Sequence, residues 1–555
     1  MLSKKSNFEG YIEYHGAKQV IVNEYSHIPL DDCGHFINGD KVLITNDNKA
    51  VLIERQPQPV IGIVQKIVNN NAILYIVNFG TVCKFVPTVD NNNYIIGDRL
   101  ILWLHKDGTI TIKSKYSNDS KNDVQCLLEM YCLTIKRPDN NEIKQNHLYT
   151  IDSVVNHNDL DTFTIDPTNS VDFDDAISVD VKNNTIYIHI VDIAGTDFSE
   201  AGYKRLRERC FTLYLSNEHT EHLLDEIDAS ENLSLIVNKQ RNVITVKVVL
   251  DEDGLVNTYN IYRSTIIVKN RYDYETVYNQ IVDNKASDSI KYLVDLTNKR
   301  SSDITYNINL PSIRIKTNNH QVESITVENT NDIAHKLVAT SMILANLIVS
   351  KHLSSENIIL PNRFHESLKG FKMPNFEHTG NESVDSFIII KRFARAYYSI
   401  DKKGHFGLGI TDYVHFTSPM RRYADVLVHR LLAGYKYENL QDEVMWINQR
   451  STLVRSIQDI YIDWKIKRWL KNSNQLYTIW ITSIAKSGIM WFMPDLSLNG
   501  FMHISELEPK QFWSYNINKL VGTTTKKELE VGSKLTVKIK KIDEITGVIG
   551  FLLYS

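Results

Sequence analysis

The stretch from Thr164 to Ile177 places four carboxylates within ten residues of one another. They are Asp166, Asp172, Asp174 and Asp175. Pro167 to Ser170 form a turn-prone break inside the group, and apolar neighbours such as Ile165 and Phe173 indicate partial burial. Crowded carboxylates repel one another, and burying an unpaired charge is costly. A divalent cation is the usual offset, and Mg²⁺ prefers carboxylate oxygens. The stretch therefore predicts a metal site; an acidic surface loop is the alternative.

Length and charge limit the classes of protein that this chain can belong to. With 555 residues it exceeds the size at which a single core stops growing, so we expect several domains. Its 43% hydrophobic and 23% charged residues are ordinary for a globular protein. A net charge of −4 argues against coating nucleic acid by bulk charge. Any nucleic-acid binding must use a local basic surface.

The cysteines and the chain start indicate a reducing, cytoplasmic location. The five cysteines are scattered without metal-ligand spacing, so we expect free thiols. The first residues are polar and lack a secretory signal. The longest charge-free apolar run of helical type, Leu337 to Ser350, is too short to span a bilayer. We expect it to be a buried helix and the protein to have no membrane partner.

The first 115 or so residues have the pattern of an all-β region. Short apolar segments alternate with turns. The Gly-Asp turn of Asn38-Gly39-Asp40 returns as Ile96-Gly97-Asp98, each leading into a predicted strand. We interpret residues 1–58 and 59–123 as two similar small β-barrels of the OB type, which commonly bind single strands. A β-region without a ligand is the alternative.

The middle of the chain, residues 124–472, mixes helices and strands. We expect a short helix over 124–133, a strand with period-two alternation over 185–192, and a helix from Asn331 to His352. His335 and His352 in that helix are interpreted as structural histidines. Basic residues from Arg450 to Lys471 are interpreted as a solvated helix face.

A second chemical signal is His405-Phe406-Gly407-Leu408-Gly409, followed by residues 415–425. Ser418 suits a helix N-cap and Pro419 the first helical position. Arg421 would then lie in the first turn, where backbone N–H groups attract anions. Arg421 and Arg422 together predict a phosphate-binding corner. A surface pair of Arg421 with Asp425 is the alternative.

Residues 473–555 predict a final five-stranded β-domain of the OB type. Trp491, Phe501 and His503 lie on its expected strands, and Lys538, Lys540 and Lys541 lie on or just after a later expected strand of the same domain. They could stack on bases and contact phosphates. The aromatic side chains could equally belong to the core, most of all Phe501.

Taken together, these motifs resemble the RNase II / RNase R exoribonucleases with their RNB catalytic domain. The acidic stretch is similar to the RNB signature in its Asp spacing. His189-Ile190-Val191-Asp192 resembles the strand that follows it, and 405–425 resembles the second signature. Arg209 to Leu215 resembles a segment that carries a base-stacking tyrosine. The resemblance implies a multidomain α+β fold with two cold-shock-like OB barrels, a mixed α/β RNB domain and a C-terminal OB barrel.

The resemblance also implies an activity and its residues. It implies a processive 3′→5′ exoribonuclease that hydrolyses single-stranded RNA to 5′-mononucleotides. Two Mg²⁺ ions, with Mn²⁺ as a substitute, would be held by the four aspartates. Arg421 would stabilise the phosphoryl charge. Tyr214 would stack on a base, and Tyr274 would position the terminal nucleotides. The family implies a monomer with no obligate protein partner.

Two departures and two competing hypotheses accompany this resemblance. Ala339 and Thr340 stand where the family commonly has paired glutamates, and Gln458 where relatives often have an acid. The alternative to an active nuclease is a catalytically inactive RNA-binding regulatory protein on the same scaffold. A metal-dependent DNA nuclease is a third hypothesis. The four aspartates and Arg421 are all present, which favours activity.

Overall fold

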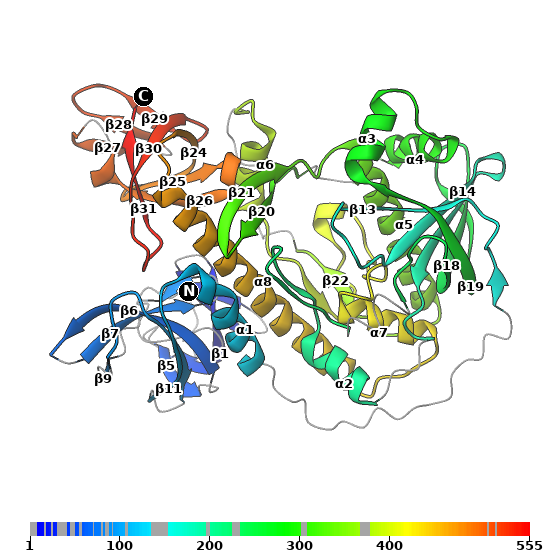
Figure 1. Ribbon diagram of the computed structural model, residues 1–555, viewed down its shortest axis with the longest axis horizontal. Coiled ribbons are helices and arrows are strands. Elements are labelled where there is room, and N and C mark those ends of the chain that lie inside the picture. Colours follow the sequence, from blue (N-terminus) through cyan, green and yellow to red (C-terminus); the bar gives the residue numbers. More distant parts are fainter. Residues whose placement is uncertain are drawn as a thin grey trace, which may run out of the picture.

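The structure is a computed structural model of the 555-residue chain. It describes residues 8–15, 18–23, 26–29, 41–44, 50–54, 58–69, 71–78, 81–83, 88–90, 93–105, 109–134, 154–195, 200–224, 233–300, 308–366, 378–507, 510–516 and 519–554. Figure 1 shows the central domain on one side and the terminal β-sheets on the other, with the long helix α8 running between them. The multidomain α+β class is confirmed.

The N-terminal region consists of two antiparallel sheets. The first has the order β3-β2-β1-β4-β5 and the second β11-β10-β6-β7-β8, with β9 beside β7. Their bounds are β1 (Phe8–His15), β2 (Lys18–Asn23), β3 (Ser26–Pro29), β4 (Lys41–Ile44), β5 (Ala50–Glu54), β6 (Gln58–Val68), β7 (Asn71–Asn78), β8 (Thr81–Cys83), β9 (Thr88–Asp90), β10 (Arg99–Leu104) and β11 (Ile110–Tyr116). The all-β prediction is confirmed. The turn at Asn38–Asp40 lies outside the described residues, and closure into barrels stays a prediction.

The central domain is built on a sheet of order β12-β19-β13-β14-β15-β18, in which β19 also pairs with β18. The strands are β12 (Val155–Asn156), β13 (Thr162–Asp166), β14 (Asp175–Asp180), β15 (Thr185–Val191), β18 (Gln240–Leu250) and β19 (Val256–Asp273). One face packs against α3 (Tyr274–Val282), α4 (Asp288–Lys299) and α5 (Ile333–Ser355). The other packs against α2 (Glu200–Arg209), α7 (Tyr423–Leu432) and the start of α8 (Leu440–Lys471). The acidic stretch is the connection from β13 to β14.

Smaller elements complete the central domain. They are α1 (Asp123–Thr134), the hairpins β16 (Leu213–Leu215) with β17 (His219–Glu221) and β20 (Ser312–Asn318) with β21 (Gln321–Glu328), β22 (Asn362–Phe364) with β23 (Tyr397–Ser399), and α6 (Glu382–Ile390). Single 3-10 turns lie at 120–122, 181–183 and 406–408.

Helix α5 is a core helix. It has 23 residues and is long and apolar enough to cross a membrane, but Leu337, Leu344, Ala345 and Val349 are buried in the core of the central domain. The expected buried helix is therefore confirmed, and it extends beyond both ends of the apolar run.

The C-terminal region also has two sheets. The larger has the order β26-β25-β24-β30-β31, and a three-stranded sheet of β27, β28 and β29 accompanies it. The bounds are β24 (Leu476–Ala485), β25 (Gly488–Met493), β26 (Leu498–His503), β27 (Trp513–Asn516), β28 (Lys519–Gly522), β29 (Glu528–Glu530), β30 (Lys534–Ile542) and β31 (Ile549–Leu553). The five expected strands are confirmed; the short β27–β29 sheet was not anticipated.

Helix α8 joins these parts through buried charges. It has 32 residues. Lys465 is 1% exposed and lies 2.9 Å from Glu218 and 3.4 Å from Asp123. Asp123 in turn pairs with Arg99 of β10 at 2.6 Å and with Arg468. The interpretation of the α8 basic residues as a solvated face is thus wrong for Lys465, because carboxylates from other segments compensate its charge.

A row of polar side chains runs across the central sheet. The hydroxyl of Ser178 lies 3.0 Å from Nε2 of His189, whose Nδ1 lies 2.8 Å from the hydroxyl of Thr245. Burial lowers the pKa of His189 to about 3, with a further contribution from His157. Burial likewise lowers the pKa of His429 in α7 to about 3. Both imidazoles are therefore neutral in the folded protein at neutral pH.

We expect these two histidines to make the fold sensitive to acid. Below an unfolded-state pKa of about 6.5, the unfolded chain binds protons that the folded chain does not, so stability falls as pH decreases from 6.5 toward 3. Each histidine contributes a slope of about 1.4 kcal/mol per pH unit in that range. Urea unfolding between pH 7.5 and 5 measures it. His189→Gln should reduce this slope by about 1.4 kcal/mol per pH unit, which corresponds to one proton. An unchanged slope would contradict the assignment of a lowered pKa to His189.

Candidate active site

The acidic stretch folds into the turn between two antiparallel neighbours, β13 and β14. Asp166 is the last residue of β13 and Asp175 the first of β14. The N–H of Ser170 donates to the carbonyl of Pro167 at 2.9 Å, which closes the expected turn. Asp166 and Asp175 therefore lie at the same end of the sheet, with Asp172 and Asp174 on the connection between them.

Asp174 connects this turn to the second motif. Its side chain is 5% exposed, and its Oδ1 accepts a hydrogen bond of 2.8 Å from the backbone N–H of Met420. Nε of Arg421 lies 3.4 Å from Oδ2 of the same carboxylate. Arg421 is 48% exposed and so remains accessible to a ligand. The two chemical signals of the sequence thus meet at one carboxylate.

Three of the carboxylates influence one another's ionisation. Burial raises the pKa of Asp166 to about 6 and that of Asp174 to about 7, against the opposing effect of Arg421. Burial, followed by the charges of Asp166 and Asp174, raises the pKa of Asp175 well above its usual range. Such a group favours a bound cation, which would stabilise the ionised forms.

Whether these residues suit a metal ion is decided by their chemistry. Oδ2 of Asp166 is buried and accepts no hydrogen bond from the residues that the structure describes. A buried carboxylate oxygen without a donor is the type of atom that a hard cation binds. Within the described ranges, however, no group of three or more His, Cys, Asp or Glu side chains is gathered closely enough to hold one ion. The carboxylate oxygens are of the chemical type that Mg²⁺ binds, and the metal site stays a prediction.

Asp172 differs from the other three in its partner. Its Oδ2 lies 2.9 Å from Nδ1 of His222, just after β17. His222 carries no signal in the sequence, because it is an isolated histidine without the spacing of a metal ligand. Only the folding of β16 and β17 into a hairpin brings it to the acidic turn.

The helix after the second motif begins later than the sequence predicts. Helix α7 starts at Tyr423, with Arg422 at the N-cap position. The N–H of Tyr423 donates to the carbonyl of Cys210, and that of Thr212 donates to the carbonyl of Arg421. This extended pairing competes with helix formation. The prediction that Ser418 caps the helix and that Arg421 lies in its first turn is therefore wrong, although Arg421 still reaches the acidic site.

Arg422 has a structural role in addition to its predicted contact with RNA. Its NH2 group donates to Oδ1 of the fully buried Asp425 at 2.7 Å. Its Nε is buried without a partner among the described residues. This ion pair gives the guanidinium a structural role, whereas its predicted contact with a phosphate stays a prediction.

Tyr214 projects from the centre of β16. Leu213 and Leu215 are buried on either side of it, whereas Tyr214 is 41% exposed. Burial of its hydroxyl end raises the pKa of Tyr214 to about 12, and Arg421, Asp172 and Asp174 also act on it electrostatically. Nε2 of Gln458 donates to the backbone carbonyl of Tyr214 at 3.2 Å. Tyr214 therefore lies near enough to Asp172 and Asp174 for their charges to act on it. Gln458, which stands where relatives often have an acid, supports the strand β16 that carries Tyr214.

Tyr274 reaches the site from the other side. It is the first residue of α3, and Asp166 pairs with Asp273 immediately before it. Its ring stacks on His335 with a centroid separation of 3.8 Å. Nδ1 of His335 lies 2.8 Å from Oδ2 of Asp332, the N-cap residue of α5. Burial raises the pKa of Tyr274, and the charges of Asp175 and Asp166 add to the effect.

The three C-terminal residues that were predicted to bind RNA differ in their exposure to solvent. Trp491 is 2% exposed and belongs to the C-terminal core, so it cannot stack on a base; this part of the prediction is wrong. Phe501 on the neighbouring strand is 41% exposed, and His503 is exposed as well. Register explains the difference, because Trp491 pairs with Gly500, and Phe501 therefore points to the opposite face.

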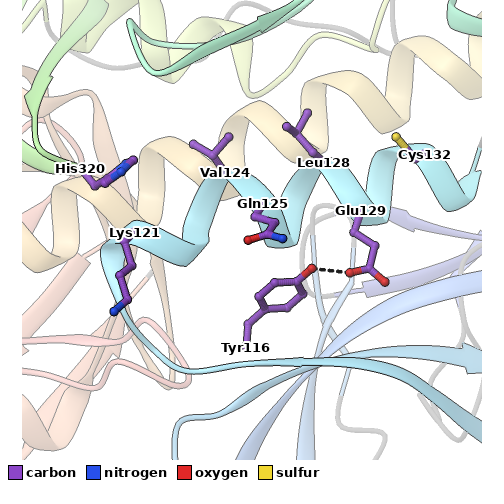
Figure 2. A pocket seen from close by; sticks show the side chains of 8 residues that line it. All are labelled: Tyr116, Lys121, Val124, Gln125, Leu128, Glu129, Cys132 and His320. Carbon is purple, nitrogen blue, oxygen red and sulfur yellow. Dashed lines mark hydrogen bonds between the residues drawn. The ribbon is translucent and has the colours of Figure 1, made fainter.

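A shallow hollow of about 510 Å³ lies away from these residues, along α1. Figure 2 shows Val124, Leu128 and Cys132 on one side of the helix. Below the helix, the hydroxyl of Tyr116 donates a hydrogen bond to the carboxylate of Glu129. None of the predicted site residues lines it. The chemistry is therefore assigned to the β13–β14 turn and not to this hollow.

Comparisons with known proteins agree with this geometry. A family model for the RNB domain matches residues 155–438. Ribonuclease R of Chlamydia muridarum is 26% identical, over 95% of this chain and 87% of that protein. Ribonuclease R of Thermotoga maritima is 28% identical, over 70% of this chain and 63% of that protein. The chain therefore belongs to the RNB-domain family of the RNase II / RNase R type.

Solved structures share the fold. RNase R of Mycoplasma genitalium in complex with ribose-methylated single-stranded RNA has a TM-score of 0.75 at 19% identity, covering 99% of this chain and 100% of that one. Yeast Ssd1, a pseudonuclease, has a TM-score of 0.70 at 13% identity, covering 97% and 82%. A nuclease and a pseudonuclease share this architecture, so the site residues must decide between the two functions.

Trp491 and Phe501 should respond in opposite ways to truncation. Trp491→Ala should lower the free energy of unfolding by about 3–5 kcal/mol through the cavity it leaves, measured by urea unfolding. Phe501→Ala should leave stability nearly unchanged. It should weaken single-stranded RNA binding by about 1–3 kcal/mol for a lost base stack, measured by fluorescence anisotropy. Unchanged RNA affinity in Phe501→Ala would remove Phe501 from the interface.

Proposed function

We propose that this protein is a Mg²⁺-dependent 3′→5′ exoribonuclease that degrades single-stranded RNA processively to 5′-mononucleotides. The observation that carries the proposal is Asp174, a buried carboxylate that Met420 anchors and that faces Arg421 beside Asp166 and Asp175. Family membership and the ribonuclease R relatives support the reaction class.

The four aspartates would hold the metal, with Asp174 as the buried donor and Asp166, Asp172 and Asp175 as partly buried donors. Bound divalent ions, two in this proposal and replaceable by Mn²⁺, supply charge stabilisation at the attacking and leaving oxygens of a phosphodiester. The N–H of Met420 keeps Asp174 in one orientation. Burial of Asp174 excludes water from this carboxylate and would strengthen its interaction with a cation.

Arg421 and Tyr214 would act on the RNA itself. The guanidinium of Arg421 is half-exposed next to Asp174 and would donate to the phosphoryl oxygens, where negative charge develops. The exposed face of Tyr214 would stack on a base near the 3′ end, which tolerates any sequence. Contacts to 2′-hydroxyls would distinguish RNA from DNA.

The alternative function, an inactive RNA-binding protein, has a structural precedent in yeast Ssd1. A loss of catalysis would relax the need for buried carboxylates, because burying them without a cation is costly. Here Asp174 is buried, the charges of Asp166 and Asp174 act on the partly buried Asp175, and Arg421 lies beside Asp174. These features favour the active enzyme.

The first test uses RNA labelled at its 5′ end. With Mg²⁺ we expect progressive shortening, which EDTA abolishes; a 3′-labelled RNA should release labelled mononucleotide at once. Asp174→Asn keeps an oxygen that can accept from Met420 but loses the charge, and we expect a loss of at least about 100-fold in kcat. Asp180→Asn, at the far end of β14, is the matched control and should be active. Intact protein that degrades no RNA, or that degrades matched DNA equally well, would refute the proposal.

The second test concerns Arg421. Arg421→Met should reduce kcat by about 10²–10³-fold, as expected for the loss of one donor to developing charge. Arg421→Lys should retain part of the activity, because it keeps the charge but lacks the planar fork. Single-turnover degradation measures both, with thermal unfolding as a check on folding. Equal activity of the Arg421→Met and wild-type proteins would exclude a role for the guanidinium in the reaction.

A further inference from the structure

The imidazole of His222 is fixed against one of the proposed metal-binding carboxylates. Nδ1 of His222 lies 2.9 Å from Oδ2 of Asp172, and the two side chains are 16% and 10% exposed. An ionised carboxylate only accepts hydrogen bonds, so the imidazole donates through Nδ1. Oδ2 of Asp172 is thereby occupied, and Oδ1 is the oxygen left for another ligand.

The backbone around His222 holds this imidazole in place. The guanidinium of Arg209 donates to the carbonyl of His222 and pairs with Glu221 at 2.7 Å. The N–H of Leu223 donates to the hydroxyl of Thr212 at 3.1 Å. His222 is therefore tied on both sides to α2 and to the strand that leads into β16.

The hairpin that carries His222 also carries Tyr214. Tyr214 pairs with Thr220, and Leu213 pairs with Glu221 next to His222. Asp172 acts electrostatically on Tyr214 as well. The hydrogen bond from His222 to Asp172 thus connects the hairpin that carries Tyr214 to the acidic turn.

We propose that His222 is a positioning residue that orients Asp172 toward the divalent cation and fastens the Tyr214 hairpin to the metal site. The inference rests on the proposed function. Hydrogen bonds to metal-binding carboxylates fix their orientation, and their loss typically reduces metal affinity by about 10–100-fold. Asp174 receives such a bond from a backbone N–H of Met420; Asp172 receives its bond from an imidazole, so that a single substitution can remove it.

A purely structural role makes a different prediction. If the pair only stabilises the turn, its removal should lower thermal stability and leave the affinity of the folded protein for metal unchanged. If His222 positions Asp172, metal affinity should fall while the protein remains folded. Metal binding without RNA therefore separates the two roles.

The experiment measures Mn²⁺ binding to the RNA-free full-length protein by titration calorimetry and electron paramagnetic resonance. His222→Leu should weaken Mn²⁺ binding by about 10–100-fold. It should also lower kcat at limiting Mg²⁺, with recovery at high Mg²⁺. His222→Asn places an amide N–H where Nδ1 lies and should retain most of the affinity. His219→Leu, a histidine on the same hairpin that contacts Glu221, is the matched control and should bind Mn²⁺ normally.

The outcomes separate this inference from the proposed function. Equal Mn²⁺ affinity in the wild-type and His222→Leu proteins, or an Asn variant as weak as the Leu variant, would overturn the role of His222 even if activity falls. A wild-type protein that binds no Mn²⁺ and degrades no RNA would overturn the proposed function itself. Thermal unfolding verifies that each variant folds. His222→Met, which removes the donor and introduces a flexible, unbranched side chain, replaces the Leu variant if that one does not fold.

Discussion

The hydrogen bond from the N–H of Met420 to Asp174 is the constraint on which the site depends. It spans 246 residues of sequence and connects the β13–β14 turn to the segment before α7. Asp174 is buried, and such a carboxylate needs donors and nearby positive charge. The chain supplies both from one short segment, because Met420 gives the N–H and Arg421 the guanidinium. The packing of α7 into the core therefore also sets the position of the arginine proposed to act in catalysis.

Buried charge organises the molecule on a larger scale as well. Lys465 of α8 contacts Glu218 beside the Tyr214 hairpin and Asp123 of α1, which pairs with Arg99 of the second N-terminal sheet. Removing one member would leave the others buried and unpaired, which is costly. The network therefore specifies how the N-terminal sheet, α8 and the hairpin fit together. The Tyr214 hairpin is held from two directions, by Lys465 through Glu218 and by the imidazole of His222.

Much of this architecture follows from local sequence signals. The strand predicted over 185–192, the helix around Leu337 and the five C-terminal strands have clear periodicity, and the structure contains them. The proximity of Arg421 to the aspartates could be predicted only from the family resemblance, because no local signal relates segments so far apart in the chain.

The errors share a physical cause, which is tertiary pairing. Ser418 and Pro419 have the chemistry of a helix start, but the segment pairs with residues 210–212, and the helix begins at Tyr423. Alternation shows that Trp491 and Phe501 occupy strands, yet only the register reveals that they point to opposite faces. Lys465 carries a charge, which predicts an exposed side chain. It is buried because acidic residues that are distant in the sequence compensate this charge. His222 gave no signal, because its partner Asp172 lies 50 residues away.

The order of the two halves of the site along the chain has a consequence for synthesis. Asp174 is made early, but its anchor at Met420 and the guanidinium of Arg421 come 246 and 247 positions later. Core packing of α7 and α8 requires later residues still. A ribosome must therefore produce Arg421 and the first residues of α8 before the four aspartates and Arg421 can occupy one site. Chains that end before Arg421 lack this constellation, and therefore lack the site to which the proposed catalysis is assigned.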